Sequence, residues 1–377
     1  MPIEAYTFDA ASTSRYLELC RDLYRRDRRW IPPLERSVRA QFSPDFAFYR
    51  RAGNAHRHFL ATAGGRPLGH VSAFVNADLR DLDGTPVGAV GFFECIDDYP
   101  VASDLLGAAR AWLEAEHGRR RVWGPMKFDI WHGYRMMTHG FDTEIFFGEP
   151  YNQPYYAALF ERAGFGVRKR WHSVEVAQRE VLEAQIGPWA ADWAQARADG
   201  YRLAPIDVRN PAHVLALHQA VEDSFRGFLG FAALTRAEFE GVFAGYAQAL
   251  DPRLVLGAWR PDGALCGFAI AYPDQARALR AMRGSDALLA RVRFLVHARR
   301  SRRAVFFMVG ITAAELARGR GLARALGYQW VGSLLAAGYD SVVFALLAED
   351  SPAWHLLPAP RERPAKTYAL YEVDSAR

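Results

Sequence analysis

The chain has 377 residues with an ordinary globular composition, 50% hydrophobic and 24% charged, and this length favours two domains or two packed halves over a single core. Its formal net charge is +5 with a pI near 9.1, carried mostly by arginine, which suits phosphate or carboxylate partners. Three scattered cysteines, no secretory signal pattern and no apolar run long enough for a membrane span disfavour a disulfide framework or stable membrane insertion, so we expect a soluble cytoplasmic protein.

The first half begins with a predicted helix from about Ser14 to Arg28, followed by the proline-rich turn WIPPLER. Two apolar runs around Gly64-Gly65 predict a β-hairpin, and GTPVGAVGFFECID predicts a further strand. The pattern then predicts a helix from about Val101 to His117, a buried strand RRVWGPM, a helix in YNQPYYAALFERAGFG that ends at Gly164, and a returning strand RKRWHSVEV.

The second half shows the same order of elements. Helices fill about Pro211 to Leu250, and a hairpin turns at Pro261-Asp262-Gly263. The strand AVFFMVGI leads into LARGRGLARALG and a helix to about Ala337, and the strands YDSVVFALLAED and KTYALYEV follow. No residue-level repeat is visible, so only the architecture repeats. We therefore expect an α/β protein of two similar lobes, residues 1–178 and 210–377, joined by a linker over 179–209.

The segment LARGRGLARALG combines backbone freedom and positive charge at the start of a helix. The first N–H groups of a helix have no partner within it, and the helix dipole adds partial positive charge there. Glycines let the backbone approach an anion closely, and Arg318, Arg320 and Arg324 add side-chain donors. The spacing fits neither a dinucleotide fingerprint nor a Walker A loop. A solvated surface turn is the alternative, but the strand before it and the apolar helix after it favour a phosphate site.

Residues Arg318 to Ala323, RGRGLA, resemble the pyrophosphate loop of the GCN5-related N-acetyltransferase (GNAT) superfamily, which has the form Arg/Gln-x-x-Gly-x-Gly/Ala. The resemblance implies that this loop holds the pyrophosphate of acyl-CoA, and that the strand before it separates from its neighbour to admit the thioester. It also implies two lobes that are each a mixed, mostly antiparallel sheet flanked by helices. The implied donor-binding residues are Val309, Gly310, Ile311, Thr312, Arg318, Gly319, Arg320, Gly321, Leu322, Ala323 and Arg324.

The first half resembles a degenerate copy of the same lobe. Its helix near Tyr156 is similar to the late helix of the family, with Asn152, Leu159, Phe160 and Gly164-Phe165 at matching positions. Its own loop position, DDYPVASDLLGAA, has no Gly-x-Gly and carries acids that would repel a pyrophosphate. The segments GFFECIDD, GPMKFDIW and PYNQPYY are also similar to a group of bacterial tandem acyltransferases. The resemblance therefore implies an acyl-donor site in the second half, with the first half on the acceptor side.

Transfer of an acyl group to an amine needs a base for the amine proton and an acid for the departing thiolate. Glu349 and Asp350, at the end of the late strand of the second half, are the candidate bases, although ordinary acids at a strand end, or a helix cap in the case of Asp350, are the commoner explanation. The second half has no counterpart of the family's late-helix tyrosine, so Tyr368 and Tyr371 of the closing strand are the candidate acids by proximity alone, with Tyr368 preferred. Cys95 is interpreted as a buried thiol, and no metal site is expected. Further candidates with common structural alternatives are Glu222, Asp223, His355 and the aromatic loop GPMKFDIWHGYRMM.

Residues 275–303 form an arginine-rich insertion, with nine arginines against the single acid Asp286. An apolar helical stripe runs through it: Leu288, Leu289, Val292, Leu295 and Val296. This basic amphipathic segment can bind the 3′-phosphate of CoA, an acidic acyl carrier protein or a membrane surface, or it is a solvated helix face. Nucleic acid is not favoured, because no aromatic residues are interleaved for stacking.

The sequence thus predicts an N-acyltransferase that moves an acyl group from acyl-CoA or an acyl carrier protein to a primary amine of a peptide or small metabolite. The apolar loops and the basic insertion favour a fatty-acyl donor over acetyl. Two alternatives stay open. One is aminoacyl transfer from charged tRNA, which tandem relatives of this fold carry out. The other is a catalytically inactive acyl-CoA-binding or scaffold protein.

Overall fold

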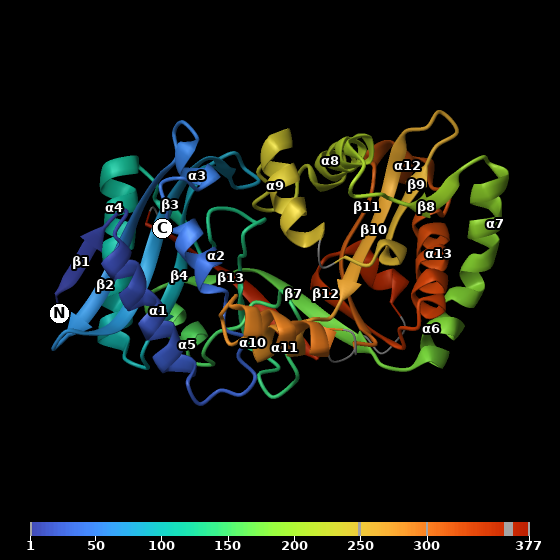
Figure 1. Ribbon diagram of the computed structural model, residues 1–377. Helices are drawn as coiled ribbons and strands as arrows, with labels where there is room; N and C mark the ends of the chain where they lie inside the picture. Colours follow the sequence, from blue (N-terminus) through green and yellow to red (C-terminus); the bar gives the residue numbers. More distant parts are fainter. Residues whose placement is uncertain (1, 248–249, 299–300, 358–364, 376–377) are drawn as a thin grey trace.

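The computed structural model describes residues 2–247, 250–298, 301–357 and 365–375. Figure 1 shows two halves side by side, with one sheet continuing through both. The strands of the first half are β1 (Ile3–Tyr6), β2 (Ala55–Ala63), β3 (Arg66–Arg80), β4 (Pro86–Cys95), β5 (Arg121–Gly124), β6 (Met136–His139) and β7 (Gly166–Val176). Its helices are α1 (Ala10–Tyr24), α2 (Glu35–Gln41), α3 (Ala47–Arg50), α4 (Tyr99–His117) and α5 (Tyr156–Arg162).

The second half repeats this plan with two additional helices between its hairpin and its long strand. Its strands are β8 (Arg202–Pro205), β9 (Val255–Trp259), β10 (Leu265–Pro273), β11 (Arg303–Ile311), β12 (Ser341–Ala348) and β13 (Lys366–Asp374). Its helices are α6 (Arg179–Ile186), α7 (Ala190–Ala198), α8 (Pro211–Phe225), α9 (Arg236–Ala247), α10 (Ala276–Met282), α11 (Leu288–Ala298), α12 (Ala313–Arg318) and α13 (Leu322–Ala336), with 3₁₀ turns at Gly187–Trp189, Pro252–Leu254 and Pro352–Leu356.

Over the described residues, the strands form a single 13-stranded sheet in the order β1-β2-β3-β4-β5-β13-β7-β12-β11-β10-β9-β8, with β6 beside β13. Only the pairs β4–β5 and β11–β12 are parallel. Helices cover both faces in each half, and each face has its own apolar core. The predicted fold class, an α/β protein with mixed and mostly antiparallel sheets flanked by helices, is confirmed.

The two halves exchange strands where they meet. The last strand of the chain, β13, lies between β5 and β7 of the first half, and β7 in turn pairs with β12 of the second half. Tyr371, for example, is opposite Gly124 on one side and Val167 on the other. Strand pairing therefore joins the two predicted lobes, residues 1–178 and 210–377. The boundaries of these lobes stay a prediction.

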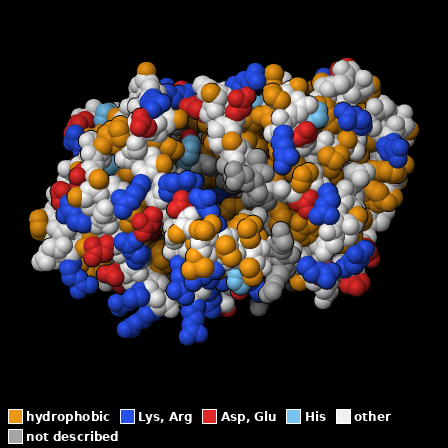
Figure 2. Space-filling model, in the orientation of Figure 1, with side chains coloured by type: hydrophobic (Ala, Val, Ile, Leu, Met, Phe, Trp, Pro, Cys, Tyr) orange, Lys and Arg blue, Asp and Glu red, His pale blue; other side chains and the backbone are white. Residues whose placement is uncertain are grey.

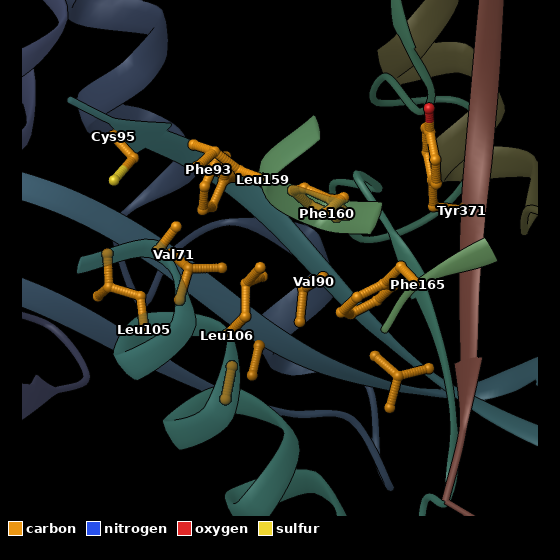
Figure 3. Packing of buried hydrophobic residues seen from close by; sticks show 14 of the residues in the cluster. Val71, Val90, Phe93, Cys95, Leu105, Leu106, Leu159, Phe160, Phe165 and Tyr371 are labelled. Carbon is orange, nitrogen blue, oxygen red and sulfur yellow. The ribbon is translucent and has the colours of Figure 1, made fainter. Parts of the chain in front are cut away.

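Strand β13 contributes side chains to both cores of the first half, because successive residues of a strand point to opposite faces. Ala369, Tyr371 and Val373 pack with α4 and α5, and Tyr368 and Leu370 pack on the side of α1 and α2. Figure 3 shows Tyr371 on this strand together with the first-half residues Phe160 and Phe165. The first half is therefore completed by the end of the chain.

Residues 179–209, predicted as a linker, form α6, α7 and the edge strand β8 of the second half. Strand β8 pairs with β9, and Leu182, Ile186 and Trp189 pack in one core with Trp330 of α13. Helix α7 also lies along α13, where Trp193 Nε1 donates to Gln329 Oε1 at 2.9 Å. This segment therefore builds one wall of the second half.

Candidate functional site

Strands β11 and β12 run parallel and then separate. Their paired residues end at Phe306 and Phe344, although β11 continues to Ile311 and β12 to Ala348. Beyond this point β12 stays paired with β7, and β11 stays paired with β10. In the described part of the chain, the final stretch of β11 therefore has one edge without a partner strand.

A bulge in β12 accounts for the separation. Leu346 has a φ of 60°, which is uncommon for a residue other than glycine, and its N–H donates to Ser173 Oγ on β7 at 3.0 Å. The register of β12 against β7 shifts between Phe344 and Leu347. Because a bulge bends its strand and increases the local twist, β12 follows β7 and leaves β11.

The predicted strand-edge residues line this opening. Val309, Gly310, Ile311 and Thr312 are all half-buried. The end of α8 comes close to them, since a Cβ added to Gly310 would lie 2.8 Å from Ser224 Cβ. Ser224 Oγ is buried, and among the described residues it has no hydrogen-bond partner. A buried hydroxyl without a partner is uncommon, so Ser224 offers a free polar group beside the open edge.

The glycine turn stands at the end of a short helix rather than directly after the strand. Helix α12 separates β11 from the turn, and Gly319 and Gly321 then take φ values of 63° and 69°, in the region that favours glycine. Helix α13 begins at Leu322, and its first bond runs from Ala325 N–H to Gly321 O at 3.0 Å. The N–H groups in the first turn of α13 have no partner within the helix. The residues that come before this turn, Arg318 to Arg320, are exposed.

Each of the three arginines of the turn is already paired with a carboxylate: Arg318 Nη1 lies 2.6 Å from Glu315 Oε1, Arg320 Nη1 3.3 Å from Asp199 Oδ2, and Arg324 Nε 2.7 Å from Asp192 Oδ2. Asp192 lies in α7 and Asp199 directly follows it. The hydrogen bond from Arg324 holds the pKa of Asp192 below its ordinary value. A diphosphate at this turn would therefore have to replace carboxylates already bound to the arginines.

The candidate bases Glu349 and Asp350 are exposed at the end of β12. Glu349 Oε1 accepts the N–H of Arg170 at 3.3 Å, and Asp350 Oδ1 lies 2.9 Å from Lys169 Nζ. Both partners belong to β7, which borders β12 on the edge opposite to β11. In this conformation both carboxylates are therefore turned away from the open edge of β11.

The candidate acid Tyr368 is fully enclosed. Its side chain on β13 has 0% exposed surface, and its hydroxyl donates to Glu149 Oε1. Burial raises the pKa of Tyr368 above its ordinary value. The structure thus brings Tyr368 to the interior of the first half and leaves it out of contact with solvent.

The equivalent position in the first half is closed. Strands β4 and β5 also separate after a short paired stretch, but the following loop fills the gap. Met126 N–H donates to Val90 O at 2.7 Å, and a Cβ added to Gly91 would lie 2.3 Å from Met126 O. The next helix, α4, is capped by its own acid, because Asp98 Oδ1 accepts from Val101 N–H at 3.3 Å. This half offers a diphosphate neither an open strand edge nor a free helix N-terminus.

The aromatic loop after β5 bridges the two halves. Trp131 Nε1 donates to Ala232 O, before α9, at 3.0 Å. Further along, the guanidinium carbon of Arg135 lies 3.8 Å from the ring centre of Tyr134 and 4.6 Å from that of Trp171. These contacts fix the loop by packing, so its conformation depends on both halves.

A polar cluster in the first half was not predicted. Glu94 Oε2, on β4, accepts hydrogen bonds from Tyr156 OH at 2.7 Å and Tyr24 OH at 3.1 Å. Lys127 Nζ lies 4.7 Å from the ring centre of Phe92. Burial raises the pKa of Glu94 to about 7 and lowers that of Lys127. Both side chains are half-buried, and a carboxyl group with such a pKa can exchange protons near neutral pH.

Two sequence features could have pointed to this cluster. Glu94 is the single acid within the apolar strand GAVGFFEC, and Lys127 is one of three lysines in an arginine-rich chain. Charged residues in such positions are seldom buried unless they are partnered. Its neighbour Cys95, interpreted as a buried thiol, is buried and free, and its burial raises the pKa to about 12.

Replacing Glu94 by glutamine should stabilise the protein at alkaline pH only. The folded-state pKa of Glu94 lies above the ordinary value of 4.5. The contribution of Glu94 to stability is therefore complete below pH 4.5 and is lost as the pH rises through 7. The glutamine side chain keeps an oxygen for Tyr156 and carries no charge. We expect little change in the free energy of unfolding at pH 5 and a gain of about 2 kcal/mol at pH 8, measured by urea denaturation.

Glu161→Gln is the matched control for this prediction. Glu161 Oε1 also accepts a hydrogen bond from a tyrosine hydroxyl, that of Tyr371, at 3.2 Å, but Glu161 is exposed. Its effect should be the same at both pH values. An equal gain for Glu94→Gln at pH 5 and pH 8 would show that the carboxyl of Glu94 is not held in its protonated form.

Two further properties concern the described residues as a whole. None of their His, Cys, Asp and Glu side chains form a group of three or more that could hold a metal ion. Their helices are either too short or too polar to cross a bilayer.

Comparison with known proteins gives two relatives in sequence, and no protein-family model matches the chain. Protein YghO of Escherichia coli is 31% identical over 146 residues, which are 38% of this chain and 36% of YghO. The bacterial ceramide synthase of Caulobacter vibrioides is 26% identical over 286 residues, 73% of this chain and 70% of that protein. The chain thus matches only about a third of the length of YghO.

Solved structures resemble the chain over nearly its whole length. A tandem GNAT protein from the clavulanic acid biosynthesis pathway superposes with a TM-score of 0.54 at 14% identity, covering 99% of this chain and 98% of that one. A GCN5-related N-acetyltransferase from Sphaerobacter thermophilus superposes with a TM-score of 0.51 at 13% identity, covering 99% and 95%. At such identities the likeness is one of fold.

Proposed function

We propose, from the tandem GCN5-related N-acetyltransferase fold that this chain has, that it transfers an acyl group from acyl-CoA or an acyl carrier protein to a primary amine of a peptide or small metabolite. One observation carries the proposal, the difference between the two halves. The second half leaves one edge of the end of β11 without a partner strand and has an exposed glycine turn after α12, whereas the first half fills both equivalent positions with its own chain.

In this proposal the donor lies along the open edge of β11. The pyrophosphate binds the N–H groups at the start of α13, where helix geometry favours an anion. Arg318, Arg320 and Arg324 move from their carboxylate partners to the phosphates, which offer charge-assisted bonds of the same kind. The pantetheine arm pairs with the backbone of β11, and the hydroxyl of Ser224 gains the partner that it lacks in the structure.

The reaction requires one bond to form and one to break. The amine nitrogen attacks the thioester carbonyl carbon, the C–S bond breaks, and the thiolate takes up a proton. N–H groups on β11 stabilise the oxyanion of the tetrahedral intermediate. Glu349 and Asp350 are the proposed bases for the amine proton, and either must first leave its contact with β7. Tyr368 can supply a proton only if β13 rearranges.

A fatty-acyl donor is favoured over acetyl within this proposal. Residues Phe306 to Val309 present half-buried apolar side chains at the opening, which suits a hydrocarbon chain. The name of the Caulobacter relative, bacterial ceramide synthase, supports the same choice, because a ceramide is the N-acyl derivative of a lipid amine. A lipid amine is thus one acceptor to include in any assay.

A second candidate is a protein that binds acyl-CoA without catalysis. It is favoured by the enclosed hydroxyl of Tyr368 and by the orientation of Glu349 and Asp350 toward β7. When acyl-CoA is the ligand, both candidates need the glycine turn to bind a diphosphate, so binding and turnover must be measured separately.

The binding test uses two glycines in the same conformation. Gly319 and Gly263 both have positive φ values, 63° and 87°, and a Cβ added to either meets nothing within 4 Å. Aspartate at Gly319 places a negative charge beside the proposed diphosphate, whereas Gly263 lies in the β9–β10 hairpin. We expect Gly319→Asp to weaken CoA binding by roughly tenfold or more and Gly263→Asp to leave it unchanged, as measured by calorimetry and thermal shift.

The turnover test measures release of free thiol from acyl-CoA of increasing chain length with amines present. Amine-dependent release that falls in a Glu349→Gln, Asp350→Asn double variant, with CoA affinity preserved, would support transfer and the proposed bases. CoA binding without any release would leave only the second candidate. If CoA does not bind the wild-type protein, acyl-CoA is not the donor and the second candidate is wrong, and a thermal shift with charged tRNA instead would favour the aminoacyl-transfer alternative.

A further inference from the structure

Helix α11 presents an apolar stripe to solvent. Five aliphatic side chains on it are between 48% and 80% exposed: Leu288, Leu289, Val292, Leu295 and Val296. Their spacing places them along one side of the helix, while Ala290 is buried. Contiguous exposed apolar surface of this kind on a soluble protein marks an interaction site.

A basic hollow lies next to this stripe. It has a volume of about 540 Å³ and is lined by Glu144, Arg277, Arg280, Ala281, Arg283 and His297. Its one acid, Glu144, lies 3.7 Å from Arg277 and 3.3 Å from Arg280. The three arginines outnumber this acid, so the hollow keeps a net positive charge and suits an anionic group such as a phosphate.

Further arginines surround the same face. Arg280 Nη2 donates to Arg29 O at 3.1 Å, which places the segment YRRDRRW beside α10. Arg25, Arg26, Arg28 and Arg29 of that segment are all exposed. Figure 2 shows hydrophobic side chains gathered over α10 and α11, with Lys and Arg side chains below them and a hollow between the two halves above.

We propose that the α10–α11 face binds the surface of an anionic phospholipid bilayer, with the apolar stripe of α11 inserted at the boundary of headgroups and acyl chains and with the arginines of the basic hollow against lipid phosphates. An interfacial helix binds through buried apolar area together with attraction to anionic lipid. Both components are present here on one face.

An acidic protein is the other partner that the arginines of this face could attract. The apolar stripe of α11 favours a bilayer over such a protein. The arginines alone would suit a carboxylate-rich surface. Five large aliphatic side chains beside them need an apolar environment, which the acyl region of a bilayer provides over the whole length of the helix. The inference goes beyond the proposed acyl transfer and does not depend on it.

The experiment is sedimentation of the full chain with vesicles of phosphatidylcholine, with and without phosphatidylglycerol. We expect binding to the anionic vesicles, weakened by salt because the charged component is screened. In Leu288→Asp with Leu295→Asp the partition coefficient should fall roughly tenfold or more. The matched control is Leu82→Asp, since Leu82 is 64% exposed in the turn between β3 and β4, and it should bind as the wild type does.

A second variant separates charge from apolar insertion. Arg277→Glu with Arg283→Glu should remove the preference for phosphatidylglycerol and leave CoA binding unchanged. Absence of wild-type binding to anionic vesicles, or binding that neither double variant weakens, would overturn the proposal. The proposal would also be overturned if the protein bound an acidic acyl carrier protein through the same residues and did not bind the vesicles. Absence of CoA binding by the wild type would count against the proposed function with acyl-CoA and would leave the membrane proposal unaffected.

Discussion

A chain that ends at Ala365 is expected to lose the cooperative fold of its first half, although every residue of that half before β13 is present. Strand β13 lies between β5 and β7, so its removal leaves one edge of each of these strands unpaired, including the long edge of β7. It also removes Tyr368, Leu370 and Tyr371, which are no more than 1% exposed. Deleting each large buried side chain costs about 3 kcal/mol or more, and their sum approaches the ~5–15 kcal/mol that stabilises an ordinary domain.

The matched control is a chain that ends at Asp374. It keeps β13 entire and loses, among the described contacts, the hydrogen bond from Ser375 N–H to Arg120 O. We expect this chain to unfold in urea with the wild-type midpoint, and the shorter chain to show no native near-ultraviolet circular dichroism from its first half. A wild-type midpoint in the chain ending at Ala365 would mean that the first half is stable without the exchanged strand.

The elements with local signals could be predicted from the sequence. The β2–β3 hairpin turns at Gly64-Gly65, which have positive φ values, and α4 runs from a cap at Asp98 to Gly118. These signals depend on residues close together in the chain. The helix predicted to begin near Ser14 begins earlier, at Ala10, because Asp9 caps α1 by accepting the N–H of Ser12 at 2.6 Å.

The strand exchange could not be predicted in the same way. The apolar run YALY in KTYALYEV fits a strand that is buried on both faces, but it carries no information about which neighbours the strand pairs with. The partners of β13 begin at Arg121 and at Gly166, far beyond the few residues of loop over which hairpin rules set strand pairing. Pairing at this distance is decided by the assembled cores rather than by turn residues.

Distance along the chain also explains why the polar contacts at the candidate site could not be predicted. The positive φ values of Gly319 and Gly321 follow from the sequence of the turn. The carboxylate partners of Arg320 and Arg324, however, lie beside α7 and in it, within the segment that the sequence predicted as a linker. The orientation of Glu349 depends on Arg170 of β7, a strand that reaches β12 only through the exchange. Polar contacts across distant elements therefore decided which predicted groups the structure brings together.

A buried ion pair fastens β13 to the first half. Lys366 Nζ lies 2.7 Å from Glu149 Oε2, with side-chain exposures of 5% and 0%, and it donates to Glu144 O at 2.6 Å. The other carboxylate oxygen of Glu149 accepts the hydroxyl of Tyr368. Burial lowers the pKa of Lys366 and raises that of Glu149, so each charge depends on the other for its solvation.

Lys366→Met is therefore expected to be strongly destabilising. Removing one partner leaves the carboxylate of Glu149 buried and uncompensated, which costs about 3–5 kcal/mol. The matched control makes the same substitution on the neighbouring strand. Lys169 pairs with Asp350, whose side chain is 68% exposed, and Lys169→Met should cost below about 1 kcal/mol, both measured by urea denaturation at pH 8.

The pH dependence of the Lys366→Met variant tests the cause of its instability. With the cation gone, the raised pKa of Glu149 lets the carboxyl take up a proton as the pH falls, and the neutral form needs no counter-charge. Because a raised folded-state pKa of an acid stabilises the protein at low pH, the deficit relative to the wild type should shrink between pH 8 and pH 5. A deficit that stays constant over this range would assign the loss to packing of the lysine side chain, and equal losses in Lys366→Met and Lys169→Met would rule out a special role for the buried pair.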